Sequence, residues 1–230
     1  MAATHWRGVG RRHNGRLPSE LALIRKHDPF TLALESLRAR AEQGAFTPGA
    51  PVVIIEEARR LNLSATPVRE ALGWLCGFGL IERAPLGGFL APRLDAALVR
   101  ERFAFRLLCL TTSLTGGDLA SRSLSRGGGL QRTSRSLSDH MLRAVRTTGN
   151  AALVDAYDRV NSPLLQLAEA ERRVFDDFEQ ESAALVGLFR RSSGSRLADA
   201  VAAYHHRRMD AAPSLILEAE AGRDVQPPDF

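Results

Sequence analysis

The sequence predicts a mainly α-helical chain of two domains, the first small and completed by a β-hairpin, the second an all-helical bundle. Two observations lead to this prediction. Between residues 29 and 93, short helical patterns alternate with turn signals and short β-type runs. After Pro92 the apolar spacing is helical almost throughout. A length of 230 residues is enough for two domains of modest size.

Composition excludes several classes of protein. With 44% hydrophobic and 25% charged residues, the chain has the make-up of an ordinary globular protein. No run approaches the roughly 18 apolar residues that a membrane span needs, and the N-terminus lacks the apolar core of a secretory signal. The two cysteines, Cys76 and Cys109, cannot build a disulfide scaffold. We therefore expect a cytoplasmic protein with no membrane partner.

The charge is divided unevenly along the chain. Residues 1–28 carry a net charge of +4 and residues 95–146 one of +5, whereas residues 147–230 carry −5. A basic front half favours a polyanionic partner for that half. We interpret residues 1–28 as a basic N-terminal arm that lies along nucleic acid; a disordered tail is the alternative.

The first domain is predicted over residues 29–93 and begins with a helix. Its apolar residues recur at the spacing of one helical face: Phe30, Leu34, Leu37 and Ala41. Gly44 and the Thr47-Pro48-Gly49 turn end this helix. A short strand over 51–54 and a second helix over 56–61 follow.

A third helix begins at Thr66-Pro67, with Thr66 as N-cap and Pro67 in the first turn. Its apolar residues share one face: Val68, Ala71, Leu72 and Leu75. Two short strands over 80–83 and 89–91 are joined by a turn in which Gly87 and Gly88 can take positive φ. Helix, strand, helix, turn, helix and hairpin is the order of a winged helix-turn-helix.

The turn, the third helix and the hairpin also carry a more specific pattern. They contain Ser64-Ala65-Thr66-Pro67-Val68-Arg69-Glu70-Ala71-Leu72, then Gly79-Leu80-Ile81-Glu82-Arg83 and Gly87-Gly88-Phe89. The domain over 29–93 thereby resembles the DNA-binding domain of GntR-family bacterial transcription regulators. The resemblance implies that double-stranded operator DNA is a partner.

Residues 94–218 are predicted to form the helical bundle, and residues 219–230 a tail. The expected helices cover 94–114, 130–147, 151–168, 170–191 and 196–218, with a Gly-, Ser- and Arg-rich loop over 115–129. On the first of them we expect Leu98, Phe105 and Leu108 to be buried. The helix order and the stretch HMLRAVRTTGNAAL are similar to the FCD (FadR C-terminal-like) subgroup of the GntR family. That resemblance implies an effector-binding and dimerisation domain.

The third helix supplies the first candidates for DNA contact. A recognition helix presents its N-terminal residues to base edges and phosphates, and Arg69 lies on the polar face, where it can reach a guanine or a phosphate. Ser64 and Thr66 can donate to phosphates. The further candidates lie on the second helix and in the wing: Arg59, Arg60, Gly87 and Gly88. The structural alternatives are a solvated arginine and an ordinary hairpin turn.

Two positions depart from the family pattern. The family carries an arginine between the turn serine and Thr-Pro, where this chain has Ala65. It carries another near the start of the second helix, where this chain has Ile54-Ile55-Glu56. Each good bidentate contact to a base is worth about 1–3 kcal/mol. We therefore expect an operator that differs from the usual one, with Arg59, Arg60 and the basic arm partly compensating through phosphates.

The resemblance also implies a divalent metal in the bundle, held by one aspartate and three histidines. The candidates here are Asp139, His140, His205 and His206. Asp139 is adjacent to His140 instead of four residues before it, so the two do not share a helical face. Ser182 stands where the resemblance places another histidine. We therefore expect no metal and no other cofactor, and we name His140 and His205 as candidate effector-binding residues; polar or surface histidines are the alternative.

The expected function is that of a homodimeric, DNA-binding transcription regulator. The resemblance favours a repressor whose operator affinity changes when a small molecule, such as a carboxylate, binds the bundle. The alternative is a winged helix that no longer reads DNA and acts as a dimeric protein-interaction module. A metal-dependent enzyme that uses His140 and His205 is a third hypothesis. The sequence contains no P-loop, GxSxG or HExxH motif, so we expect no enzyme.

Overall fold

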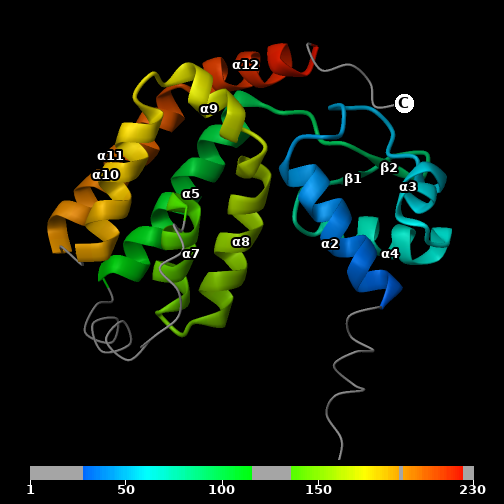
Figure 1. The fold of residues 1–230 in the computed structure, drawn as a ribbon, viewed down its shortest axis with the longest axis horizontal. Coiled ribbons are helices and arrows are strands. Elements are labelled where there is room, and N and C mark those ends of the chain that lie inside the picture. The colour runs from blue at the N-terminus through cyan, green and yellow to red at the C-terminus, as the bar shows by residue number, and fades with distance from the viewer. Residues whose placement is uncertain (1–27, 116–135, 192–193, 225–230) are drawn as a thin grey trace, which may run out of the picture.

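The computed structural model describes residues 28–115, 136–191 and 194–224. They form a small lobe of helices with one hairpin and a larger lobe of helices alone (Figure 1). The expected mainly α-helical architecture, a winged helix-turn-helix followed by a helical bundle, is confirmed. The basic arm over 1–28, except Asp28, and the loop over 116–129 lie outside the described residues.

The small lobe follows the predicted order of elements. These are α2 (Pro29–Glu42), α3 (Ile54–Leu61), α4 (Ala65–Cys76), β1 (Glu82–Arg83) and β2 (Phe89–Leu90). Its core joins one face of each helix to the hairpin, through residues that include Leu37, Ala58, Leu72, Ile81 and Phe89. The antiparallel hairpin pairs Glu82 with Leu90 and Arg83 with Phe89.

Local side chains explain where these helices begin and end. The carboxylate of Asp28 accepts hydrogen bonds from the backbone N–H groups of Phe30 and Thr31, and so caps α2. Asn62 ends α3 in the left-handed conformation, with φ of 54° and ψ of 44°. Asparagine tolerates this conformation better than most residues. The tight turn between α3 and α4 therefore depends on Asn62.

Three boundaries in the small lobe differ from the sequence prediction. The expected strand over 51–54 is reduced to one bridge, Pro51 to Leu90, with the Val52 N–H donating to Phe89 at 2.9 Å. Helix α3 begins at Ile54 instead of residue 56. Helix α4 begins at Ala65, with Ser64 as its N-cap, so Thr66 lies inside the first turn.

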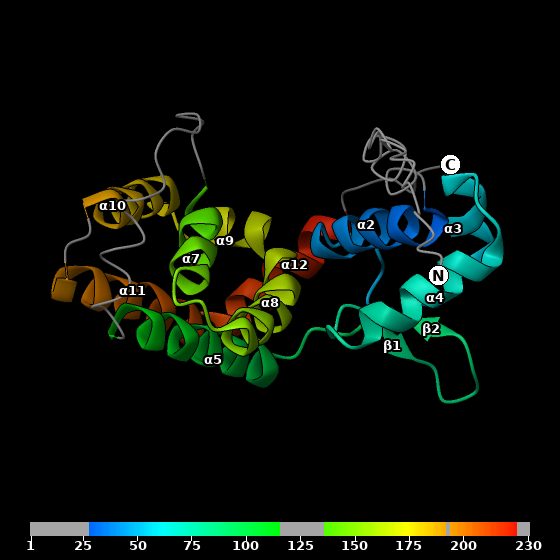
Figure 2. The same cartoon turned by 90° about the horizontal axis from the view of Figure 1, so that it is seen from below.

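The large lobe contains the remaining described helices. These are α5 (Ala96–Thr115), α7 (Leu137–Arg146), α8 (Ala151–Leu165), α9 (Ala168–Val174), α10 (Phe178–Arg191), α11 (Gly194–Asp210) and α12 (Ala212–Asp224). Helix α5 packs against α11 and α8, while α12 packs against α9 (Figures 1 and 2). The apolar residues form two clusters, one around Phe103 and Leu215 and the other around Leu110 and Tyr157.

Two helices predicted as continuous are each interrupted. The expected helix over 170–191 breaks at Phe175, whose backbone is extended (φ −115°, ψ 101°) and whose ring is buried in the core. The expected helix over 196–218 is divided between α11 and α12, just before Pro213. Proline cannot donate to the preceding turn and disfavours helical geometry in the residue before it. Helix α12 then continues to Asp224, six residues beyond the expected end of the bundle at 218.

The buried face of α5 is not the one that the apolar spacing favours. Leu98, Phe105 and Leu108, which we expected to be buried, are 39%, 45% and 58% exposed. The face that packs against the bundle instead carries a mixture of apolar and polar residues: Val99, Phe103, Arg106, Cys109, Leu110 and Ser113. Because an arginine and a serine lie on this face, the spacing of hydrophobic residues alone predicts the wrong face of α5 to be buried. Among the helices described, none is long and apolar enough to cross a membrane.

The two lobes contact each other through α8. The guanidinium of Arg38 in α2 donates to the Ser162 hydroxyl at 2.7 Å, and that of Arg159 donates to the Gly77 carbonyl at 2.7 Å. Both guanidinium groups also lie over the ring of Phe78, at 5.2 and 5.0 Å from its centre. The bundle thus contacts the segment that immediately follows α4, through Arg159.

Candidate DNA-binding surface and buried arginine clusters

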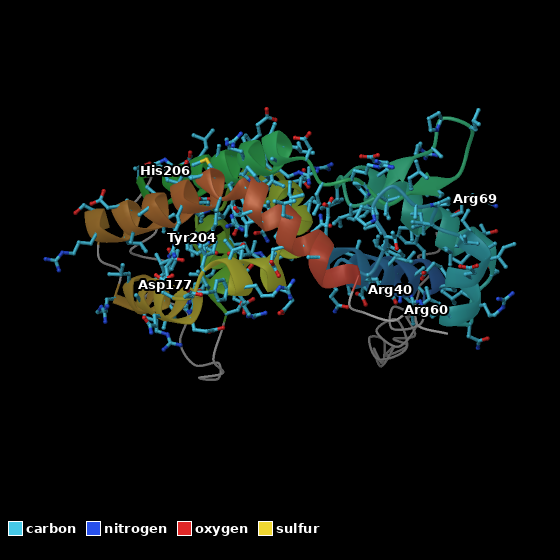
Figure 3. The ribbon with its side chains drawn as sticks, turned by 90° about the horizontal axis from the view of Figure 1, so that it is seen from above. Arg40, Arg60, Arg69, Asp177, Tyr204 and His206 are labelled. Atoms are coloured by element: carbon cyan, nitrogen blue, oxygen red, sulfur yellow. The ribbon has the colours of Figure 1, made fainter. Side chains whose placement is uncertain are left out.

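The polar face of α4 is exposed at the end of the small lobe that points away from the bundle (Figure 3). Its opposite face is anchored by Val68, Ala71, Leu72 and Leu75, which are fully buried. Thr66 and Arg69 are exposed, and the side chain of Arg69 extends into solvent. The Ser64 hydroxyl makes no capping bond. All three predicted groups are thus available at one helix start, where backbone N–H groups also favour anions.

The two candidate arginines of α3 differ in their environments. Arg60 donates to Glu57 at 2.9 Å and to the Ser36 hydroxyl at 3.3 Å. Glu57, which is 8% exposed, also pairs with Arg40 at 3.4 Å. Arg60 is therefore part of the packing between α2 and α3, whereas Arg59 is exposed and forms no ion pair with the residues that the structure describes.

The wing is a tight loop held by its own backbone. The Ala84 N–H donates to the Gly88 carbonyl at 3.1 Å, and the Gly87 N–H donates to the Ala84 carbonyl at 3.0 Å. Gly87 and Gly88 have φ values of 98° and 87°, a region that L side chains rarely adopt. Both are exposed, and a Cβ atom added at either would meet no described atom within 4 Å, so this loop offers bare backbone to a partner.

The two departures from the family pattern lie near this surface. Ala65 is the first residue of α4 and Ile55 the second of α3, where its side chain is 64% exposed. An apolar side chain at this exposed position supplies no contact to a phosphate or a base edge. Among the arginines of α3 and α4, Arg69 and Arg59 are left as the exposed cations that no described acid neutralises.

A cluster of polar groups lies in the core of the bundle. His205 is fully buried, and its Nδ1 lies 2.7 Å from the Val201 carbonyl, which fixes the proton on that nitrogen. Its Nε2 accepts from Arg106 at 3.0 Å. Arg106 donates in turn to the Asn161 side chain at 3.1 Å. Burial, and then the adjacent Arg106 charge, hold the pKa of His205 well below its usual value of 6.5.

A second buried arginine, Arg208, lies one turn beyond His205 on α11. Its guanidinium donates to Glu171 at 2.7 Å and lies 2.8 Å from Glu181. The Tyr204 hydroxyl also donates to Glu171, at 3.2 Å. Arg208 is fully buried yet faces two carboxylates. These contacts join α9, α10 and α11, and the region is shown beside Tyr204 and Asp177 in Figure 3.

The candidate metal ligands are not gathered into one site. Asp139 is used in a capping box with Ser136 at the start of α7, and the ring of His140 stacks on Phe189. Both nitrogens of His205 have partners within the bundle, while His206 is exposed. Within the described ranges, no group of three or more His, Cys, Asp or Glu could hold a metal ion.

Sequence reasoning did not single out Arg106, Asn161 or Arg208. One signal was present, because Arg106 falls seven residues after Val99 and three after Phe103, on a single helical face. An arginine within an otherwise apolar stripe indicates a buried polar contact. Its partners, 55 and 99 residues away, required the structure.

Known proteins are similar to this chain in part of its sequence and in its fold. No protein-family model matches the chain. In sequence it is 31% identical over 103 residues to the HTH-type transcriptional regulator McbR of Escherichia coli, a match that covers 44% of this chain and 47% of McbR. The matched segment thus spans about half the length of that relative.

The structures give broader coverage. E. coli McbR/YncC matches with a TM-score of 0.58 at 15% identity, over 81% of this chain and 97% of that one. A GntR transcriptional regulator of Rhodococcus sp. RHA1 matches with a TM-score of 0.61 at 13% identity, over 80% of this chain and 97% of that one. The chain is thus similar in part of its sequence to the transcription regulator McbR and in fold to McbR/YncC and the Rhodococcus GntR protein.

The described residues contain both parts expected from the sequence, the winged helix and the helical bundle. The two named relatives are described as transcription regulators. The bundle also contains two buried arginines, of which only Arg208 pairs with carboxylates of the described residues.

Proposed function

We propose that this chain is a transcription regulator that binds operator DNA through α4 and the wing. The observation that carries the proposal is the exposed N-terminal turn of α4. There Ser64, Thr66 and Arg69 present donors to solvent while the opposite face is packed. Arg59 and the bare backbone of Gly87 and Gly88 extend the same surface toward phosphates.

The regulator acts as a homodimer in this proposal. Two recognition helices must meet two half-sites at a fixed spacing, about one turn of DNA. The exposed face of α5 is the surface that we assign to the second copy. It carries three of the large exposed hydrophobic side chains, Leu98, Phe105 and Leu108, on one side of one helix. Helix α5 itself lies at an edge of the bundle (Figure 2).

We further propose that a small-molecule effector binds in the bundle and changes the affinity for operator DNA. The regulator represses transcription in this proposal. The resemblance to the FCD subgroup motivates both, and a carboxylate is the class that it implies. An effector changes operator affinity only if it binds two arrangements of the protein with different affinities. The contacts of α8 with Arg38 and Gly77 provide a direct physical connection between bundle and winged helix.

Fluorescence anisotropy tests the DNA-binding proposal. The full chain is titrated onto DNA from upstream of its own gene and onto scrambled DNA, from about 50 to about 200 mM salt. We expect specific, steeply salt-dependent binding, which Arg69→Ala weakens by about 1–3 kcal/mol. Arg190→Ala, at an exposed arginine near the end of α10, is the matched control and leaves binding unchanged.

Two results would contradict the proposal. If binding to both DNAs is negligible at every salt concentration, the winged helix is a protein-interaction module. If Arg69→Ala and Arg190→Ala weaken binding equally, α4 is not the recognition helix.

A further inference from the structure

Leu86 is the most exposed of the large hydrophobic side chains in the ranges that the structure describes. Its relative exposure is 102%, whereas that of the next, Leu217, is 68%. It lies at the tip of the wing, in the loop that joins β1 to β2. No described residue covers this leucine, and an apolar side chain gains most from a partner that removes it from water.

The loop holds Leu86 in a fixed position. Pro85 precedes it with a φ angle that the proline ring fixes, and Gly87 and Gly88 follow it in the left-handed region. The Gly87 N–H donates to the Ala84 carbonyl at 3.0 Å and closes the turn around Leu86. A side chain that a rigid turn presents loses little freedom on binding, so more of the energy of its burial contributes to affinity.

The base of the wing is fixed beside α4. The ring of Phe89 is buried in the core of the small lobe, and the guanidinium of Arg83 lies 5.5 Å from the centre of this ring. A Cβ atom added at Gly73 of α4 would lie 3.4 Å from Nη2 of Arg83. The wing therefore starts next to the middle of α4, and it projects from the same end of the small lobe as Arg69 (Figures 2 and 3).

The chemistry of the wing tip limits what it can recognise. Residues 84–92 carry no charged or hydrogen-bonding side chain. These side chains can therefore neither pair with a phosphate nor read the donors and acceptors of a base edge, and no carboxylate among them repels phosphates. The two glycines keep the loop thin, which suits the minor groove of DNA, only about 6 Å wide. Leucine and proline are among the side chains that proteins insert between base pairs from that groove.

We propose that Leu86, backed by Pro85, enters the minor groove beside α4 and wedges between two adjacent base pairs, which kinks the duplex. With α4 in the major groove, the wing lies over the neighbouring minor groove. This inference rests on the proposed function and adds to it a residue that selects sequence by the ease of unstacking, without a hydrogen bond. The steps that unstack most easily are TA and CA/TG, so we expect one of them under each wing.

The first experiment places a reporter of base stacking in the DNA. Duplexes that the full wild-type chain binds are selected from a random pool, and 2-aminopurine then replaces each adenine of the bound site in turn. The fluorescence of this base is quenched while the base is stacked and rises when a neighbouring base is pulled away. We expect one 2-aminopurine in each half-site, within a TA or CA/TG step, to brighten severalfold with the wild type and with Leu86→Met, but not with Leu86→Ala.

Affinity for the selected DNA provides the second readout. We expect Leu86→Ala to weaken binding by roughly tenfold, the order expected when a leucine no longer buries its side chain. The dependence of binding on salt should not change, because no phosphate contact is lost. The thermal unfolding midpoint should also stay the same, because Leu86 is fully exposed. Leu217→Ala, at the exposed leucine of α12, is the matched control and should change neither the affinity nor the fluorescence.

Three results would overturn the inference. The first is that every 2-aminopurine stays quenched with the wild type, and the second is that Leu86→Ala brightens the same base equally. The third is that Leu86→Ala binds as tightly as the wild type. A chain that binds the selected DNA through Arg69 without brightening any base loses only this inference. If the wild type selects no DNA at any salt concentration, the proposed function itself fails, so the two failures are distinguishable.

Discussion

Arg38 of the winged helix and Ser162 of the bundle are joined by a hydrogen bond of 2.7 Å, in which the guanidinium donates to the hydroxyl. Ser162 is 1% exposed, so this contact lies within the junction between the lobes. The guanidinium of Arg38 also lies over the ring of Phe78, directly after α4. One side chain of α2 therefore contacts both the bundle and the segment that follows α4.

The contribution of this junction can be measured with a double-mutant cycle. Ser162→Ala leaves the Nη2 atom of Arg38 without its acceptor, while Nε keeps its ion pair with Glu42 at 2.8 Å, and we expect the free energy of unfolding to fall by about 1 kcal/mol. Arg38→Ala removes the same bond, so the double variant should lose less than the sum of the single losses. Urea unfolding provides these values. Ser36→Ala is the control, because Ser36 also accepts from an arginine, Arg60, but on an exposed surface; additive losses at 38 and 162 would show that the contact is not formed.

Acid should destabilise the chain through His205. Its pKa is lower in the folded state than its ordinary value of 6.5, because burial and Arg106 disfavour the charged ring. Below about pH 6.5 the unfolded chain therefore binds a proton that the folded chain does not, and stability falls as the pH falls. The expected slope approaches about 1.4 kcal/mol per pH unit, measured as the free energy of urea unfolding between about pH 7.5 and about pH 5.5. His205→Gln should flatten this slope, whereas His206→Gln, at the exposed neighbouring residue, should leave it unchanged.

The turn between α3 and α4 should respond to substitutions at Asn62. Its φ of 54° lies in the left-handed region, where a side chain with a Cβ is strained and glycine is not. We expect Asn62→Ala to destabilise the chain by about 1 kcal/mol and Asn62→Gly to be neutral or stabilising. Gln43→Ala, at the right-handed C-cap of α2, is the control for loss of a polar cap residue. Equal thermal midpoints for Asn62→Ala and Asn62→Gly would contradict this explanation of the turn.

The exposed face of α5 should determine the oligomeric state. Phe105→Glu places a charge at the centre of the face that we assign to the second copy, and burying an unpaired charge is costly. We expect the variant to be monomeric, and the wild type dimeric, in size-exclusion chromatography with light scattering. Leu217→Glu, at a side chain 68% exposed on α12, is the matched control and should stay dimeric. A dimeric Phe105→Glu would assign the interface to another surface.

The small lobe was largely predictable because its signals are local. The signals are the spacing of Leu34, Leu37 and Ala41, the Thr66-Pro67 start and the Gly87-Gly88 turn. Each acts within a few residues, and the hairpin and α4 form close to the expected positions. The helix starts there differ from the prediction by one or two residues, as between Ser64 and Thr66 for the N-cap of α4, whereas the strand expected over 51–54 is reduced to one bridge. Such shifts arise because neighbouring polar residues compete to cap the same helix.

The sequence predicted that residues 94–218 form a bundle of helices, but not which face of α5 is buried or where the helices break. The packed face of α5 includes Arg106, whose burial depends on His205, 99 residues away in the sequence. The break at Phe175 likewise depends on burial of its ring against other helices. No local pattern contains these long-range partners, so apolar spacing selected Leu98 and Phe105 for the core instead. The predicted DNA contacts at Arg69 and Arg59, and the effector residues, stay predictions.

Arg159 of α8 contacts Gly77 and Phe78, which follow directly on the C-terminal end of α4. A movement of α8 can therefore tilt α4 about this end. Arg69 precedes Gly77 by eight residues, which corresponds to about 12 Å along a helix that rises about 1.5 Å per residue. If that end is the pivot, a tilt of about 15° moves Arg69 by about 3 Å, roughly the length of a hydrogen bond. If Arg69 contacts a base edge as proposed, a tilt of α4 by that angle is enough to break the contact. On the proposed function, release of DNA would then require no separation of the lobes.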